Sequence, residues 1–405
     1  MTTEKRLIII SSLILLGLSS SIIYHIFLVS WHGPYYPYNT FLCCPWDHFN
    51  DFYYHTRYAP DPYHLNSPDP NHLPFLYIIL NLLKDAPKSL LFLTLVGSFG
   101  ITFIFWTTKH LTEISAKKRA FFSLILFVSF PVIFALDRGN FELVIFVFLC
   151  LFVTLYYSHH RLSLLFLCLA TLIKPFPAIF FVLLIGDKRY KDILWALVFI
   201  ATVTIISFGL LPGRALENIL LYLQILKRYE IVYEAGQYGL PFNSSLFGAI
   251  RYVILTAKPQ TNLYENYMFL KYPYMLLAGI IAIGIITVVI RFETVFWKKL
   301  LFLCLLMILG PFVSANYRML RILIPAIMFL GSSTHEKSEF FYLITFGILF
   351  IPKDYSRLNT FPDVSIAVLI DPLIMIIIAV LTSISAIKKT EFFVSSSKSS
   401  LERNS

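Results

Sequence analysis

Long apolar runs alternate with short polar connections over almost all of the 405 residues. The runs are continuous and show no strict alternation of apolar and polar positions, which indicates helices and excludes a transmembrane β-barrel. About 20 apolar residues are enough to cross a bilayer. We therefore predict an all-α polytopic integral membrane protein. The apolar runs cover residues 7–30, 89–108, 120–136, 141–157, 161–173, 175–186, 193–211, 270–290, 299–313, 319–331, 339–351 and 365–387.

The sequence Lys174-Pro175-Phe176-Pro177 interrupts what would otherwise be one span over residues 161–186. Proline lacks a backbone N–H and clashes with the preceding turn of a helix. A lysine in an apolar run also needs water or an anion beside it. We predict two short helices that meet at this break and return the chain to the side from which it came.

Lysine and arginine gather in every second connection, as is typical of cytoplasmic loops. The broken hairpin keeps all of these basic connections on one side and gives about twelve transmembrane segments with both termini in the cytoplasm. It also places four unusually polar stretches together on the extracytoplasmic face. The basic connections are 117–119, 188–191, 291–299 and 388–389, and the polar stretches are 31–88, 137–140, 212–269 and 314–318.

Composition agrees with this assignment, since hydrophobic residues make up 58% and charged residues only 14% of the chain. A net charge of +10 would suggest nucleic acid as the partner of a soluble protein. Here the basic residues lie in short connections, where they set orientation, so we expect no nucleic-acid partner. We expect one transmembrane domain over residues 1–390 and a disordered cytoplasmic tail over 391–405.

The stretch 46–59 combines carboxylates, imidazoles, an arginine and a row of aromatic residues directly after the first apolar run. The surrounding prolines leave it as the only helix-length gap before about residue 75. On such a helix Asp47, Asp51 and His55 share one face. The mixture is typical of a pocket at the membrane surface for a polar substrate attached to a lipid. An interfacial helix with a Tyr/Trp belt is the alternative. Short helices are also predicted at 75–84 and 215–228.

Sugar transfer from a lipid phosphate needs a base for the attacking hydroxyl and cations for the leaving phosphate. A glycosidase needs two carboxylates because its leaving group must be protonated. When the donor is a phosphate diester, the lipid phosphate leaves as a stable anion, so one carboxylate is enough. Asp51 is the first candidate for this base, and Asp47 is the alternative. The candidate cations are Arg57, Arg138, Lys174, Arg318 and Arg321.

Four short motifs resemble glycosyltransferase family 87 of the GT-C superfamily, in order over roughly residues 45–330. Asn50-Asp51-Phe52-Tyr53-Tyr54 is similar to the Asp-Phe-x-x-Tyr motif of that family. Three further segments resemble other motifs of the family, namely Arg138-Gly139-Asn140, Lys174-Pro175-Phe176-Pro177 and Asn243-Ser244-Ser245-Leu246. One family segment, Ser-Pro-x-x-Trp-x-His, is different here, because the stretch 310–318 lacks the histidine and ends at Arg318.

The resemblance implies a GT-C-type enzyme that transfers a hexose, here mannose, with inversion from a polyprenyl-phosphate donor to a hydroxyl of a glycolipid or glycan acceptor. It implies a site on the extracytoplasmic side of a bacterial inner (plasma) membrane, surrounded by membrane lipids. The lipid-phosphate sugar is a substrate, and we expect no cofactor and no metal. Asp51 would be the general base. Lys174 and Arg318, with Arg57 or Arg138, would hold the phosphate, and Tyr54, Asn140, Asn243 and Ser245 would line the sugar or acceptor pocket.

Three alternatives remain open from the residues alone. A transporter would also use broken helices and polar residues at mid-membrane, but it should show two similar halves, and the Asp51 motif has no second copy. Asp47, His48, Asp51 and His55 have the helical spacing of metal ligands, although no distant carboxylate–histidine cluster supports them. Asn243-Ser244-Ser245 also fits the N-glycosylation pattern.

Overall fold

The computed structural model describes residues 1–33, 48–64, 70–258, 262–332, 338–353 and 364–402, with side chains up to residue 388 except that of His32. The chain is mainly helical in these ranges, which contain no strand; Asn243 and Ala315 form an isolated antiparallel bridge. The helices are α1 Thr3–His32, α2 Asn50–Tyr58, α3 Pro74–Leu82, α4 Lys88–His110, α5 Ala116–Phe127, α6 Phe130–Arg138, α7 Glu142–Leu155, α8 His160–Ile173, η1 Phe176–Phe180, α9 Phe181–Gly186, α10 Tyr190–Leu210, α11 Ala215–Tyr229, η2 Glu230–Glu234, α12 Leu246–Ala257, α13 Leu263–Arg291, α14 Phe296–Leu309, η3 Asn316–Ile322, α15 Leu323–Leu330, α16 Glu339–Phe350 and α17 Ala367–Glu402.

Each predicted apolar run coincides with a helix, which confirms the all-α membrane fold. Within the described residues, five helices are long and apolar enough to cross a bilayer, namely α1, α4, α10, α13 and the part of α17 up to Lys388. The pair α5 and α6 makes a sixth span if its 60° bend is counted within one crossing. The other runs form shorter helices, so the number of twelve crossings stays a prediction.

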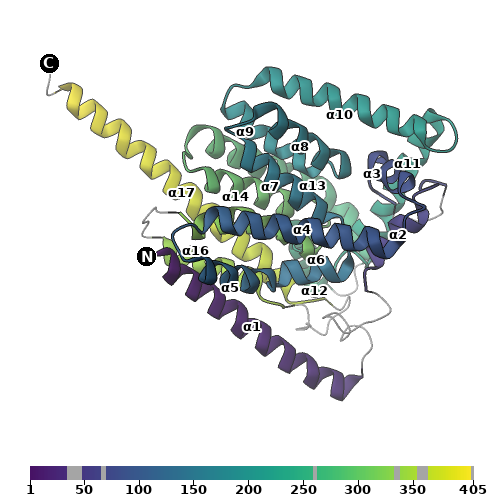
Figure 1. Cartoon of the computed structure of the whole chain (residues 1–405), viewed down its shortest axis with the longest axis horizontal. Helices are drawn as coiled ribbons and strands as arrows, with labels where there is room; N and C mark the ends of the chain where they lie inside the picture. The colour runs from purple at the N-terminus through teal and green to yellow at the C-terminus, as the bar shows by residue number, and fades with distance from the viewer. Residues whose placement is uncertain (34–47, 65–69, 259–261, 333–337, 354–363, 403–405) are drawn as a thin grey trace.

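Helix α1 lies along one edge of the molecule, α10 lies along the opposite edge, and α17 leads away from the body (Figure 1). Helix α10 and helix α13 leave large apolar side chains exposed, which suits contact with lipid tails. Helix α7 lies inside and packs against α4 and α8, where Phe99, Phe103 and Phe146 form a buried aromatic cluster. Helix α17 continues to Glu402 and so includes most of the segment for which we expected a tail.

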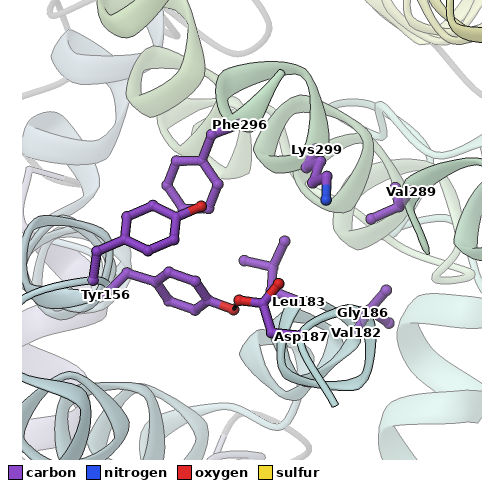
Figure 2. Close-up of a pocket in the computed structure, with 9 residues that line it drawn as sticks. Tyr156, Val182, Leu183, Gly186, Asp187, Val289, Phe296 and Lys299 are labelled. Atoms are coloured by element: carbon purple, nitrogen blue, oxygen red, sulfur yellow. Dashed lines mark hydrogen bonds between the residues drawn. The ribbon is translucent and has the colours of Figure 1, made fainter. Parts of the chain in front are cut away.

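The predicted broken hairpin is confirmed. Helix α8 ends at Ile173, Lys174 has an extended backbone with φ −142° and ψ 140°, and η1 and α9 return the chain. Tyr156, just before α8, donates a hydrogen bond of 2.8 Å from its hydroxyl to Asp187, just after α9. Figure 2 shows these two side chains pointing toward each other beside a cavity of about 10 Å³, which has room for about one water molecule.

Ion pairs identify the residues that share the end of the molecule at which the chain begins, called here the N-terminal end. Arg6 binds Glu339 at 2.8 Å, and Lys118 binds Glu4 at 2.6 Å. Lys109 contacts the carbonyl of Thr154, which adds the Tyr156–Asp187 corner to the same end. This end therefore collects the basic connections 117–119 and 188–191.

Tyr63, in the connection after α2, packs at a centroid distance of 6.0 Å against Phe208. Phe208 lies near the last turn of α10, which begins at Tyr190 beside the N-terminal end. A helix of 21 residues spans about 30 Å. Residues 61 and 191 are thus separated by the length of a membrane-spanning helix.

We predict that Asp61→Cys and Lys191→Cys react with an impermeant maleimide from opposite sides of the membrane. Both positions are exposed, and the variants would be made without the native cysteines. Asp61→Cys should label in intact cells and Lys191→Cys only after lysis, with Lys118→Cys as a control that behaves like Lys191→Cys. Equal labelling of positions 61 and 191 in intact cells would contradict the described topology.

Candidate active site

A cavity of about 650 Å³ opens at the end of the molecule opposite the N-terminal end. It is lined by parts of all four polar stretches that the sequence predicts on one face, together with the break between α8 and η1. The predicted convergence of these stretches is therefore confirmed for the described residues. The polar and charged lining residues include Asn50, Asp51, Tyr54, His55, Asn71, His72, Asp137, Arg138, Asn140, Lys174, Tyr229, Tyr233, Glu234, Tyr317 and Arg318.

Helix α2 is held against the turn between α6 and α7 by a close backbone contact. The Phe49 N–H donates a hydrogen bond of 2.7 Å to the carbonyl of Asp137. Gly139 has φ +60°, and a Cβ atom there would lie 2.9 Å from the Cβ of Phe52 and 3.2 Å from the Cα of Phe49. Only glycine fits both this conformation and this contact. Gly139 thus allows the first turn of α2 to lie directly against Arg138 and Asn140, the two residues that flank this glycine.

Asp51 lies in the first turn of α2, and both of its carboxylate oxygens accept hydrogen bonds from the turn between α6 and α7. Its Oδ1 accepts from Arg138 at 2.7 Å, and its Oδ2 accepts from the Asn140 amide at 2.5 Å. Burial alone would raise the pKa of Asp51, but Arg138 and Asn140 together outweigh it and leave the pKa below its usual value. Asp51 is therefore a carboxylate at neutral pH that faces the cavity.

Lys174 lies one layer deeper and is bound to Glu142, which the sequence analysis overlooked. Its Nζ donates to Glu142 Oε1 at 3.0 Å and lies 3.4 Å from Asn140 Oδ1. Glu142 Oε2 accepts from Arg321 at 2.8 Å, and both Glu142 and Arg321 are fully buried. A lone carboxylate in the apolar run 141–157 was the signal for this ion pair, since such a charge needs a partner inside a membrane.

Arg318 is the buried cation of the cavity wall that has no carboxylate partner among the described residues. Its Nη1 donates to the carbonyl of Val313 at 2.9 Å, and its guanidinium carbon lies 4.8 Å from the ring centroid of Phe176. The buried Nε has no hydrogen-bond partner in the described part of the chain. Arg318 can therefore take an anion without giving up an ion pair.

Asn243 and Ser245 are buried but do not line the cavity, which differs from the predicted role in substrate binding. The Asn243 amide donates to Phe312 O at 2.9 Å, and its oxygen accepts from Ser314 N at 2.8 Å. The Ser245 hydroxyl donates to Phe312 O and accepts the N–H of Gly248 as the N-cap of α12. These side chains hold in place the segment that leads to Arg318.

Arg57 is exposed and lies outside the cavity, with its guanidinium carbon 5.5 Å from the ring of Tyr58. It follows Asp51 by six residues, which turns it to a different face of α2. Tyr54 lines the cavity as expected from the sequence. His72 also lines it, and nothing in the sequence pattern marked this residue.

Among the described residues, His48, Asp51 and His55 of the alternative metal site do not form a group that could hold a metal ion. His48 Nε2 lies 3.3 Å from Asp137, and His55 Nδ1 lies 3.1 Å from the hydroxyl of Tyr77. Asp47 is outside the described residues. Within the described ranges, no three side chains of His, Cys, Asp or Glu are grouped so that they could hold a metal ion.

The sequence model of glycosyltransferase family 87 matches residues 70–314, which is more than half of the chain. The chain belongs to glycosyltransferase family 87. No curated protein and no solved structure matches it. The matched range contains Asn140, Lys174 and Asn243 but ends before Arg318 and begins after Asp51. The hydrogen bonds from Arg138 and Asn140 join Asp51 directly to the matched part. The protein is thus a glycosyltransferase with membrane-spanning helices, which leaves no support for a transporter.

Proposed function

We propose that the enzyme transfers a hexose, mannose by the family resemblance, from a polyprenyl phosphate to an acceptor hydroxyl of a glycolipid or glycan. The observation that carries this proposal is the composition of the 650 Å³ cavity, which is lined by an ionised carboxylate and by a cation that has no carboxylate partner among the described residues. Asp51 would act as the base, and Arg318 would bind the phosphate.

The reaction is a direct displacement at the anomeric carbon. The acceptor oxygen attacks that carbon while its proton moves to a carboxylate oxygen of Asp51. The bond between the anomeric carbon and the phosphate oxygen breaks, and the phosphate leaves with the electron pair. Attack from the face opposite the leaving group inverts the configuration. Arg138 and Asn140 hold the Asp51 carboxylate in place, and its remaining lone pairs can accept the proton.

Ion pairing around the cavity leaves Arg318 as the cation that can bind an anionic donor. Lys174 and Arg321 both pair with Glu142. The charge of Lys174 is therefore partly neutralised, and Lys174 is less available to a phosphate than the sequence analysis predicted. Arg318 therefore becomes the main phosphate ligand of the proposal, with Lys174 behind it. The charged side chains that line the cavity balance one another, with Arg138, Lys174 and Arg318 against Asp51, Asp137 and Glu234.

Apolar side chains beside these charges suit the lipid part of the donor. Phe134 and Phe242 line the cavity with their ring centroids 5.8 Å apart, and Phe312 and Val313 line it next to Arg318. A polyprenyl chain gains free energy from this contact, because burying apolar surface removes it from water. The cavity therefore combines a polar reaction centre with an apolar wall.

The extracytoplasmic location of the site is supported by the basic residues at the opposite end of the molecule. The N-terminal end carries the connections 117–119 and 188–191 and also Lys298 and Lys299, and cytoplasmic loops are enriched in such residues. We infer that both termini face the cytoplasm and that the cavity opens outward. The inner membrane of a bacterium is the proposed location.

We predict that Asp51→Asn reduces sugar transfer by about a hundred- to ten-thousand-fold, because the amide keeps the shape but accepts no proton. Donor affinity should change little, and transfer of radiolabelled sugar and donor binding would be measured on the same preparation. Asp61→Asn is the matched control, since Asp61 is exposed and outside the cavity. Near-full activity of Asp51→Asn together with loss in Asp137→Asn would contradict the assignment of the base.

We predict that Arg318→Gln weakens donor binding by about 10- to 100-fold, which corresponds to the loss of charge-assisted hydrogen bonds. Arg57→Gln is the control and should bind the donor normally. An Arg318→Gln enzyme with unchanged donor affinity would show that another group binds the phosphate.

We predict that Lys174→Met lowers the melting temperature of the enzyme, because Glu142 loses a buried partner.

A further inference from the structure

His72 is a buried histidine of the cavity wall whose ring nitrogens are both unpartnered within the described part of the chain. It is 5% exposed and lies two residues before α3 begins at Pro74. Its ring packs edge-to-face on His55 at a centroid distance of 4.4 Å and on Phe141 at 6.1 Å. Its main-chain carbonyl accepts a hydrogen bond of 2.9 Å from Tyr63. Packing and backbone contacts thus fix the ring, while both nitrogens are buried without a hydrogen-bond partner among the described residues.

A buried imidazole without partners costs folding free energy, which a polar ligand in the cavity can offset. Burial, together with the charges of His55, Lys174 and Arg318, lowers the pKa of His72 well below its usual value. The ring is therefore neutral at pH 7, with one nitrogen that donates and one that accepts. Either nitrogen can bind a hydroxyl group, because a hydroxyl both donates and accepts. A neutral ring offers no charge to a phosphate.

His72 has neighbours in both parts of the proposed site. His55, against which it packs, is one helical turn after Asp51 on α2. Phe141, its other ring neighbour, lies between Asn140 and Glu142 in the chain, and the charges of Lys174 and Arg318 reach the His72 ring. In the proposed reaction the donor sugar lies between Asp51, where the hydroxyl attacks, and Arg318, which binds the phosphate, so a residue with neighbours in both parts can contact the sugar.

We propose that His72 binds a hydroxyl group of the donor sugar and so selects a sugar-bearing lipid phosphate over the bare lipid phosphate. This inference rests on the proposed function of the same cavity. It gives His72 a role in recognition and leaves Asp51 as the group that takes the proton. The sugar hydroxyl would bind one ring nitrogen, either by donating to the unprotonated nitrogen or by accepting from the N–H.

The test compares two ligands, polyprenyl-phosphate mannose and polyprenyl phosphate, on the purified full-length enzyme in nanodiscs. His72→Phe keeps the ring that packs on His55 and removes both nitrogens. We expect it to weaken binding of the mannosyl donor by about 5- to 100-fold, as for one or two neutral hydrogen bonds. Binding of polyprenyl phosphate should stay within about twofold of the wild type. His72→Gln, which restores a donor and an acceptor, should recover part of the loss.

His110→Phe is the matched control, because His110 is a half-buried histidine that packs on Trp106 at 4.4 Å at the N-terminal end. It should bind both ligands normally. Equal weakening of both ligands by His72→Phe would make His72 a phosphate ligand, and no weakening would make it a packing residue; either result overturns the inference. If His72→Phe does not fold, the same comparison on His72→Leu, which also lacks both nitrogens, decides. Failure of the proposed function is distinguishable, since the wild type itself would then bind neither ligand.

Discussion

The buried carboxylate of Glu142 is the interaction on which the site depends. It lies in the first turn of α7 and joins Lys174, at the break of the α8–η1 hairpin, to Arg321 in η3. Removing one partner of a buried ion pair typically costs about 3–5 kcal/mol, because the remaining charge is left uncompensated. Three segments far apart in the sequence are therefore fixed at one point, and Asn140, two residues before Glu142, connects this point to Asp51.

The buried ion pairs also determine which groups are available to a substrate. Arg138 is bound to Asp51, and Lys174 and Arg321 are bound to Glu142, so these cations already have anionic partners. Arg318 has none among the described residues. Its guanidinium lies over the ring of Phe176, which follows the α8–η1 break. A site organised before the substrate binds needs little reorganisation as charge develops on the leaving phosphate. The geometry thus separates the groups that build the site from those that bind the donor.

The apolar runs predicted the helices, and the proline break predicted the hairpin, because both depend on local chemistry. Convergence of Asp51, Arg138, Asn140 and Lys174 followed from topology alone. The sequence could not show that Asn243 and Ser245 bind backbone and that Arg57 turns away from Asp51, since these outcomes depend on three-dimensional contacts. Glu142 was missed because an apolar run conceals a single charge, and His72 because its neighbours come from other segments. The periodicity of apolar residues also did not predict the lengths of the short helices, and so it could not determine the number of membrane crossings.

The most direct test of this account is a cryo-electron microscopy structure of the Asp51→Asn enzyme with polyprenyl-phosphate mannose bound and no acceptor present. The account predicts the phosphate within hydrogen-bonding distance of Arg318, the sugar beside His72, and the anomeric carbon open to attack from the side of residue 51. A phosphate bound outside this cavity, or a sugar whose anomeric carbon faces away from residue 51, would contradict it.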